Sequence, residues 1–143
     1  MVEIRRIQHS VDRYGKRFLN RVYTAAEQAY CMRKRNAAES FAARFAAKEA
    51  GAKALGTGIA QGVGWQDLGV INDDAGRPVL EVTGGARARL NALTPPGMIA
   101  QVHLSLSDDY PLAQAFVVIS AIHQSGSSPV LPAIPHPVPA ACP

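Results

Sequence analysis

The stretch Ser40–Gly58, SFAARFAAKEAGAKALGTG, decides the fold, because its composition is that of one long helix ending in a glycine loop. Ala, Leu, Lys, Glu and Arg are strong helix formers. Ser40 is a suitable N-cap, and Gly56 can adopt the left-handed conformation that often ends a helix. At helical spacing, the positions expected to face a core are Phe41, Phe45, Ala52 and Leu55.

The charged residues of this helix lie four positions apart. Arg44 and Lys48 share one stripe, and Glu49 and Lys53 form an i,i+4 pair on the adjacent stripe. One interpretation is a solvated face with a Glu–Lys pair, which the spacing alone favours. The other is an anion-binding site in which one carboxylate binds a metal ion.

Length and composition indicate one globular domain. A chain of 143 residues can bury a core, and 48% hydrophobic and 18% charged residues are ordinary proportions. No apolar run approaches the length of a membrane span, and the N-terminus has no apolar signal region, so we expect a cytoplasmic protein without membrane partners. Cys31 and Cys142 lack metal-type spacing and are expected to be free thiols.

Positive charge is concentrated in the first part of the chain. Residues 1–55 contain twelve Lys and Arg against five Asp and Glu, whereas the remainder contains three against six. A basic half of this kind favours a phosphate-bearing or acidic partner. Nucleic acid is the weaker candidate, because aromatic residues are only 6% and no nucleic-acid-binding motif is present.

Two helical segments should precede the long helix. Residues 2–7 begin extended and lead into a basic helical stretch, whose inward positions are Ile7, Val11, Phe18 and Val22. The tetrapeptide Thr24–Glu27 matches a capping box and should open a helix through about Arg35. Arg33, Lys34 and Arg35 cluster at the end of that helix, where helix-dipole stabilisation and phosphate binding are equally supported.

The following residues predict a small antiparallel sheet packed on the long helix, which is an α+β fold. The expected elements are a hairpin of strands 65–71 and 79–82, a helix at 84–93, a half-buried strand from Gln101, a turn at 108–111 and a central last strand at 112–122. Residues 123–143 contain six of the ten prolines and almost no charge. We therefore expect a folded domain of residues 1–122 and a disordered tail of residues 123–143.

Several motifs, taken in order, resemble those of bacterial holo-[acyl-carrier-protein] synthases, the small class of 4′-phosphopantetheinyl transferases. They are VEIRRI (2–7), RFLNRVYTAAE (17–27), RFAAKEA (44–50), KALGTG (53–58), GRP (76–78) and Ser105-Leu106-Ser107. The resemblance extends from residue 2 to about 122. It implies an α+β domain that forms homotrimers with active sites between subunits.

The resemblance also implies a reaction. The 4′-phosphopantetheine arm of coenzyme A, the co-substrate, would be transferred to a serine of an acyl carrier protein for fatty acid biosynthesis, with Mg²⁺ required and 3′,5′-ADP released. A diphosphate is held well by cations on a rigid helix and by a hard divalent ion on carboxylates. By resemblance, Glu49 binds the metal ion, Lys48 lies beside the transferring phosphate, and Arg44 and Lys53 belong to the cationic lining.

Two further groups of residues receive roles from the resemblance. The nucleotide would be bordered by Gly56, Thr57 and Gly58, and its 3′-phosphate or base would lie near Arg33, Lys34 and Arg35. The basic face that docks the acidic carrier would consist of Arg6, Arg13, Arg17 and Arg21.

The sequence departs from the family pattern at its start. Family members usually begin with a G-I-G-x-D strand whose aspartate is the other protein ligand of Mg²⁺, and this sequence starts at Met1 without that strand. Glu3 matches a different family position and is not assigned as a ligand. If the start codon is placed too late, an in-frame G-x-G-x-D should precede Met1 in the gene. The alternative is a family-derived protein that binds coenzyme A or the carrier with impaired or no turnover.

Two polar residues near the last strands have open roles. Many family members carry histidine at the position of Asp108, which is expected first as a turn residue and second as a hydrogen-bond acceptor or base. His103 lies on the polar face of its strand, where an interfacial role and a structural role are equally supported.

Overall fold

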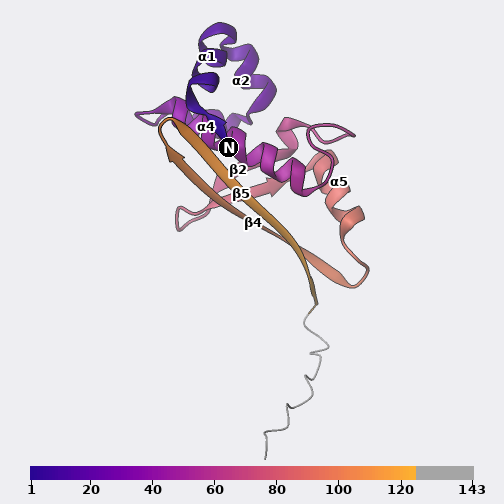
Figure 1. Cartoon of the computed structure of the whole chain (residues 1–143). Helices are drawn as coiled ribbons and strands as arrows, with labels where there is room; N and C mark the ends of the chain where they lie inside the picture. The colour runs from indigo at the N-terminus through magenta and orange to yellow at the C-terminus, as the bar shows by residue number, and fades with distance from the viewer. Residues whose placement is uncertain (125–143) are drawn as a thin grey trace, which may run out of the picture.

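Helix α4 (Ala37–Ala54) is the central element of the computed structural model, which describes residues 1–124 (Figure 1). The helix begins three residues before the expected N-cap Ser40, because Ala37, Ala38 and Glu39 are themselves compatible with a helix. Its N-cap is Asn36, whose side-chain amide donates to the Glu39 carboxylate at 3.0 Å. The expected C-terminal signal is confirmed, since Gly56 has φ +78°.

Helices and strands pack on several faces of α4, so small residues are buried on most of its circumference. Ala42, Ala46, Ala47 and Ala52 are buried, and the expected core positions Phe41 and Leu55 are buried too, with Phe45 partly so. An alanine at Gly51 would place its Cβ 2.8 Å from Leu80 Cδ2, so glycine here allows the close approach of the adjacent hairpin.

The N-terminal part forms a short strand and three helices that pack against α4 or against one another. They are β1 (Val2–Glu3), α1 (Ile4–Tyr14), α2 (Lys16–Val22) and α3 (Ala25–Met32). The extended start is therefore limited to two residues, and Gly15, with φ +53°, divides the expected single basic helix into α1 and α2. Ile7 and Val22 are buried and Val11 and Phe18 partly buried, which confirms the expected inward face.

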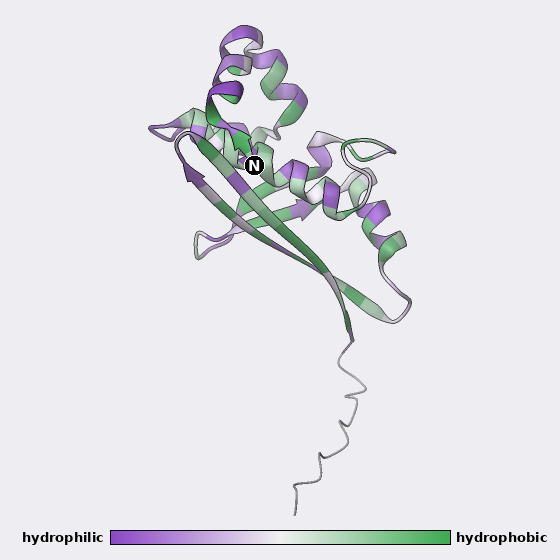
Figure 2. Cartoon of the chain, in the orientation of Figure 1, coloured by the Kyte–Doolittle hydropathy of each residue, from purple (hydrophilic) through white to green (hydrophobic). Residues whose placement is uncertain are grey.

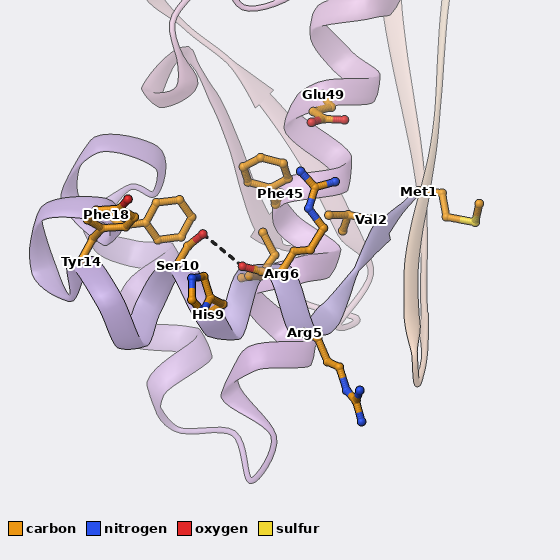
Figure 3. A pocket seen from close by; sticks show the side chains of 11 residues that line it. Met1, Val2, Arg5, Arg6, His9, Ser10, Tyr14, Phe18, Phe45 and Glu49 are labelled. Carbon is orange, nitrogen blue, oxygen red and sulfur yellow. Dashed lines mark hydrogen bonds between the residues drawn. The ribbon is translucent and has the colours of Figure 1, made fainter.

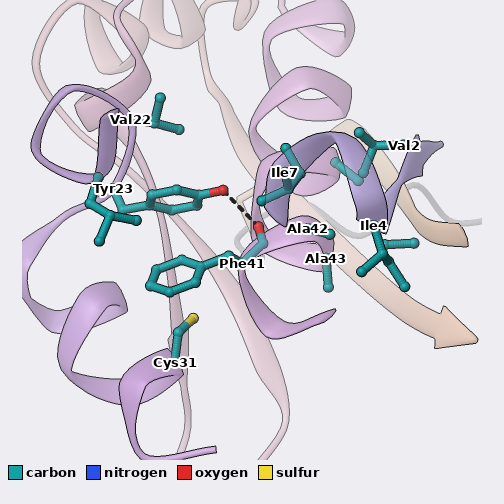
Figure 4. Packing of buried hydrophobic residues seen from close by; sticks show 12 residues of the cluster. Val2, Ile4, Ile7, Val22, Tyr23, Cys31, Phe41, Ala42 and Ala43 are labelled. Carbon is teal, nitrogen blue, oxygen red and sulfur yellow. Dashed lines mark hydrogen bonds between the residues drawn. The ribbon is translucent and has the colours of Figure 1, made fainter. Parts of the chain in front are cut away.

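The capping box of α3 is confirmed. The Thr24 hydroxyl accepts the Glu27 backbone N–H at 3.2 Å, and the Glu27 carboxylate accepts the Thr24 N–H at 2.8 Å. The helix ends at Met32, three residues before the expected end at Arg35. In the core beside it, the buried Tyr23 hydroxyl donates to the Phe41 carbonyl at 2.9 Å, and burial raises the Tyr23 pKa (Figure 4).

The long strands β4 (Met98–Asp109) and β5 (Leu112–His123) form an antiparallel ribbon across α4. The strand order is β1-β5-β4, so the last strand is central as expected. Asp108 and Asp109 pair with Ala113 and Leu112, so the expected turn shrinks to two residues and Asp108 is a strand residue rather than a turn residue.

Alternate residues of this ribbon face the core and the outside. Val102, Leu104, Leu106, Val117 and Ile119 pack against the core. Figure 2 shows many hydrophobic residues along both strands. On the outward face, polar residues such as His103 and Ser105 lie beside Val118 and Phe116, of which 58% and 65% are exposed. Exposed apolar side chains of this size within a mixed face are typical of an interaction surface.

The second sheet is the hairpin of β2 (Leu68–Asn72) and β3 (Pro78–Val82), followed by helix α5 (Gly84–Leu93). Residues 65–67, expected as the start of β2, form a 3₁₀ turn called η1 (Trp65–Asp67). None of the helices within residues 1–124 combines the length and the apolarity that a bilayer crossing needs. The predicted tail, apart from His123 in β5 and Gln124, and with it Cys142, lies outside the described residues.

Candidate functional site

Lys48 is fully buried, whereas from the sequence we expected it beside a transferring phosphate. Its Nζ is 2.8 Å from Glu27 Oε2 and donates to the carbonyls of Trp65 at 3.0 Å and Leu68 at 2.9 Å. These contacts use all three protons of the ammonium group. Burial lowers the Lys48 pKa, and the Glu27 charge opposes that shift. The expected contact with a transferring phosphate is therefore corrected: Lys48 is an internal cation joined to a buried carboxylate.

Arg44 shares this buried stripe, one turn earlier. Only 4% of it is exposed, its guanidinium lies 4.0 Å from the Tyr30 ring centroid, and Nη2 donates to Asn72 Oδ1 at 3.2 Å. Arg44 thus packs between α3 and the β2–β3 hairpin rather than lining an anion site beside Glu49. The stripe of Arg44 and Lys48 is not a solvated face either.

Glu49, one residue after Lys48, points away from this buried network and is partly buried. Within residues 1–124 its carboxylate has no hydrogen-bond or ion-pair partner, and it makes no ion pair with Lys53. Two cavities meet at Glu49. The larger one, about 570 Å³, lies between α4 and the α1–α2 helices; we call it the α1 cavity (Figure 3).

The α1 cavity combines apolar and basic side chains. Phe18 and Phe45 form apolar parts of its wall, and Figure 3 shows the Arg6 side chain extending toward Glu49. Arg6, Arg13, Arg17 and Arg21 are all exposed on α1 and α2. The basic surface expected from the sequence therefore exists, and Arg6 brings it to the cavity that contains Glu49.

The smaller cavity, about 310 Å³, contains the other site residues that the structure brings together; we call it the loop cavity. Its lining residues are Glu49, Ala52, Lys53, Gly58, Ile59 and Trp65. Lys53 is exposed and lies one helical turn after Glu49. The loop that follows is well fixed, because the N–H groups of Thr57 and Gly58 both donate to the Ala52 carbonyl.

The basic cluster of Arg33, Lys34 and Arg35 lines neither the α1 cavity nor the loop cavity of its own chain. All three residues are exposed after the end of α3, and the Lys34 ammonium lies 4.5 Å from the Tyr30 ring centroid. His103 and Asp108 are likewise exposed on β4. Their predicted roles therefore depend on surfaces outside the Glu49 site.

Sequence reasoning missed Trp65. Its ring stacks on Phe45 with centroids 4.8 Å apart and an interplanar angle of 30°. Since Phe45 lines the α1 cavity and Trp65 the loop cavity, this pair lies between the two cavities. The available signal was a single tryptophan directly after a glycine-rich loop. Glu27 was seen only as a capping residue, although its carboxylate also holds Lys48.

Glu49 suits a hard divalent cation. Carboxylate oxygen is a preferred ligand of Mg²⁺, which proteins often bind through one or two carboxylates together with substrate phosphates. Glu49 meets this need because its carboxylate borders open space and has no competing protein partner within residues 1–124. The same residues contain no group of three His, Cys, Asp or Glu side chains that could enclose a metal ion.

Comparisons with known proteins identify relatives of this chain. Residues 1–115 match the family model described as the 4′-phosphopantetheinyl transferase superfamily. The chain is 59% identical over 126 residues to a holo-[acyl-carrier-protein] synthase of Rhodopseudomonas palustris, covering 85% of this chain and 89% of that protein. A protein of the same name from Mesorhizobium japonicum is 56% identical over 122 residues, with the same two coverages.

Solved structures show the same similarity. The crystal structure of a holo-[acyl-carrier-protein] synthase from Neisseria meningitidis superposes with a TM-score of 0.72 at 33% identity, covering 83% of this chain and 92% of that one. The Helicobacter pylori counterpart, solved in complex with coenzyme A, gives a TM-score of 0.70 at 28% identity, covering 83% of this chain and 95% of that one.

Proposed function

The chain belongs to the holo-[acyl-carrier-protein] synthases of the 4′-phosphopantetheinyl transferase superfamily, and we propose that it transfers the 4′-phosphopantetheine arm of coenzyme A to a serine of an apo-acyl carrier protein. In this reaction the serine oxygen bonds to the phosphorus that carries the arm. The bond from that phosphorus to the nucleotide breaks, releasing 3′,5′-ADP and a proton. We further propose that the holo-carrier serves fatty acid biosynthesis in the cytoplasm.

The observation that carries this proposal is the meeting of two cavities at one carboxylate. A transfer between a nucleotide and a protein needs two approaches to one reacting centre. The loop cavity, with Lys53 beside Glu49, suits the diphosphate of coenzyme A. The α1 cavity, with Arg6 at its wall and basic helices around it, suits an acidic carrier. Both substrates would then reach Glu49.

Each residue of the site receives a limited role. Glu49 would hold Mg²⁺, which neutralises charge on the diphosphate when bound. Lys53 would bind a phosphate oxygen through its ammonium group, and the fixed loop of Gly56, Thr57 and Gly58 would border the nucleotide. The carrier would dock on Arg6, Arg13, Arg17 and Arg21.

We also propose that the protein assembles as a homotrimer. The exposed apolar side chains of Phe116 and Val118, at the middle of the outward face of β4 and β5, support burial against other copies. Sites between subunits would let Arg33, Lys34 and Arg35 of one copy approach a nucleotide held by its neighbour. Light scattering should give a trimer mass for the parent chain and a smaller mass for Phe116→Asp, whereas Asn91→Asp on α5 should stay trimeric.

The proposed function is tested by incubating the chain with coenzyme A, Mg²⁺ and an apo-acyl carrier protein. Intact mass should show the carrier gaining one phosphopantetheine group, and a carrier whose modified serine is replaced by alanine should gain none. Omitting Mg²⁺ should abolish the gain. If coenzyme A and carrier bind without any mass gain, the chain is instead a family-derived binding protein without turnover.

A further inference from the structure

We propose that the buried pair of Glu27 and Lys48 is a positioning device that fixes Trp65 and thereby shapes the loop cavity beside Glu49. The proposal rests on the proposed transferase function, because it concerns the cavity assigned to coenzyme A. Glu27 and Lys48 are positioning residues in this account. Neither lines the α1 cavity or the loop cavity, and the side chains of both are 0% exposed.

The pair joins four elements at one point. Lys48 lies on α4, and its ammonium donates to the Trp65 carbonyl of η1 and to the Leu68 carbonyl of β2. Glu27 lies on α3, where Oε2 accepts the Thr24 N–H and Oε1 accepts the Val70 N–H of β2 at 2.8 Å. The segment 65–70 is therefore attached to both helices through charge-assisted hydrogen bonds, which are stronger than neutral ones.

This attachment acts directly on the loop cavity. The Trp65 backbone is held by Lys48, and its ring is held by stacking on Phe45 one turn before Glu49. Glu49 follows Lys48 in α4, and Glu49 and Trp65 both line the loop cavity. The ion pair of Lys48 therefore fixes the position of the Trp65 backbone relative to the part of α4 that carries Glu49. Loss of the Lys48 ammonium would release the Trp65 backbone without substituting any residue that lines the loop cavity.

Stability alone does not account for such a pair. Two buried charges lose their hydration, and replacing both with apolar groups is often neutral or stabilising. The lowered pKa of Lys48 reflects this desolvation. A role in holding Trp65 gives the pair a function that an apolar replacement cannot supply, because only a donor at position 48 can bind the Trp65 and Leu68 carbonyls.

The test separates positioning from stability with three variants. Lys48→Met leaves the Glu27 charge unpaired, Glu27→Gln/Lys48→Met removes both charges, and Tyr23→Phe is the control. The control removes a different buried hydrogen bond to α4, that of the Tyr23 hydroxyl with the Phe41 carbonyl. Trp65 is the only tryptophan, so intrinsic fluorescence reports its surroundings in each variant. Thermal unfolding, emission maximum, and kcat and KM for coenzyme A are measured for each.

We expect Lys48→Met to lower the Tm, shift Trp65 emission to longer wavelength and reduce kcat on the order of 100-fold, as misplaced reacting groups do. The double variant should recover most of the Tm but neither the emission nor kcat. Tyr23→Phe should lower the Tm while keeping emission and kcat near the parent values.

The proposal is overturned if the double variant regains kcat together with its Tm, or if Tyr23→Phe loses as much kcat as Lys48→Met. It is also overturned if folded Lys48→Met keeps the parent emission and turnover. If the parent chain transfers no phosphopantetheine at all, the proposed function fails. Trp65 emission in the double variant then decides by itself whether the pair fixes Trp65.

Discussion

Gly85 offers a test in which helix propensity and tertiary packing predict opposite signs. Gly85 is the second residue of α5, and alanine is favoured over glycine in helices by about 1 kcal/mol. Propensity alone therefore predicts that Gly85→Ala stabilises the protein. In the structure, however, an alanine Cβ at this position would overlap the backbone carbonyl oxygen of Gly62.

The structure predicts net destabilisation. Overpacking costs about 1–3 kcal/mol, and a clash with backbone belongs at the upper end because it cannot be relieved by rotating a side chain. Subtracting the helix gain of about 1 kcal/mol leaves a loss of about 2 kcal/mol in the free energy of unfolding. For a domain of this size, that loss lowers the Tm by about 6–10 °C.

The assay combines thermal unfolding with coenzyme A kinetics. Gly62 lies in the loop that carries Gly58 and Ile59 into the loop cavity, so its displacement should raise the KM for coenzyme A. Asn91→Ala, at an exposed position of the same helix, is the matched control and should stabilise slightly. A Gly85→Ala variant with a Tm equal to or above that of the parent chain would refute the close contact between α5 and the loop.

Three further predictions concern the site, the docking face and the core. Glu49→Ala should abolish transfer with little change in Tm, because its carboxylate has no protein partner within residues 1–124; near-normal rates at saturating Mg²⁺ would exclude Glu49 as the metal ligand. Arg17→Glu should raise the KM for the carrier more than that for coenzyme A, with the difference shrinking in high salt, and equal losses would argue against docking on α2. Burial raises the Cys31 pKa from 9.0 to about 11, so the unfolded chain releases this proton first and the free energy of unfolding should fall as pH rises from about 9 to 11. Urea unfolding across this range should show a weaker pH dependence for Cys31→Ala, and an unchanged slope would contradict the assignment.

The sequence determined those features whose causes lie within a few residues. The composition of α4, the left-handed Gly56, the capping box of Thr24 and Glu27 and the β2–β3 hairpin all follow from local chemistry, and each is found in the structure. The motif order also identified the family. The predicted boundaries were less accurate. Helix α4 begins at Ala37, before the expected cap, because the residues there are good helix formers, and helix α3 ends early, at Met32, where the following residues are exposed.

Tertiary structure alone decided which charged residues of α4 serve the site. Arg44, Lys48, Glu49 and Lys53 are equivalent candidates in a helical pattern, since spacing gives their relative directions but not what lies in each direction. The packing of α3 and β2 over one stripe encloses Lys48 with Glu27, a residue 21 positions earlier, and leaves Glu49 facing two cavities. Such partners depend on how distant segments meet, and no local pattern carries that information.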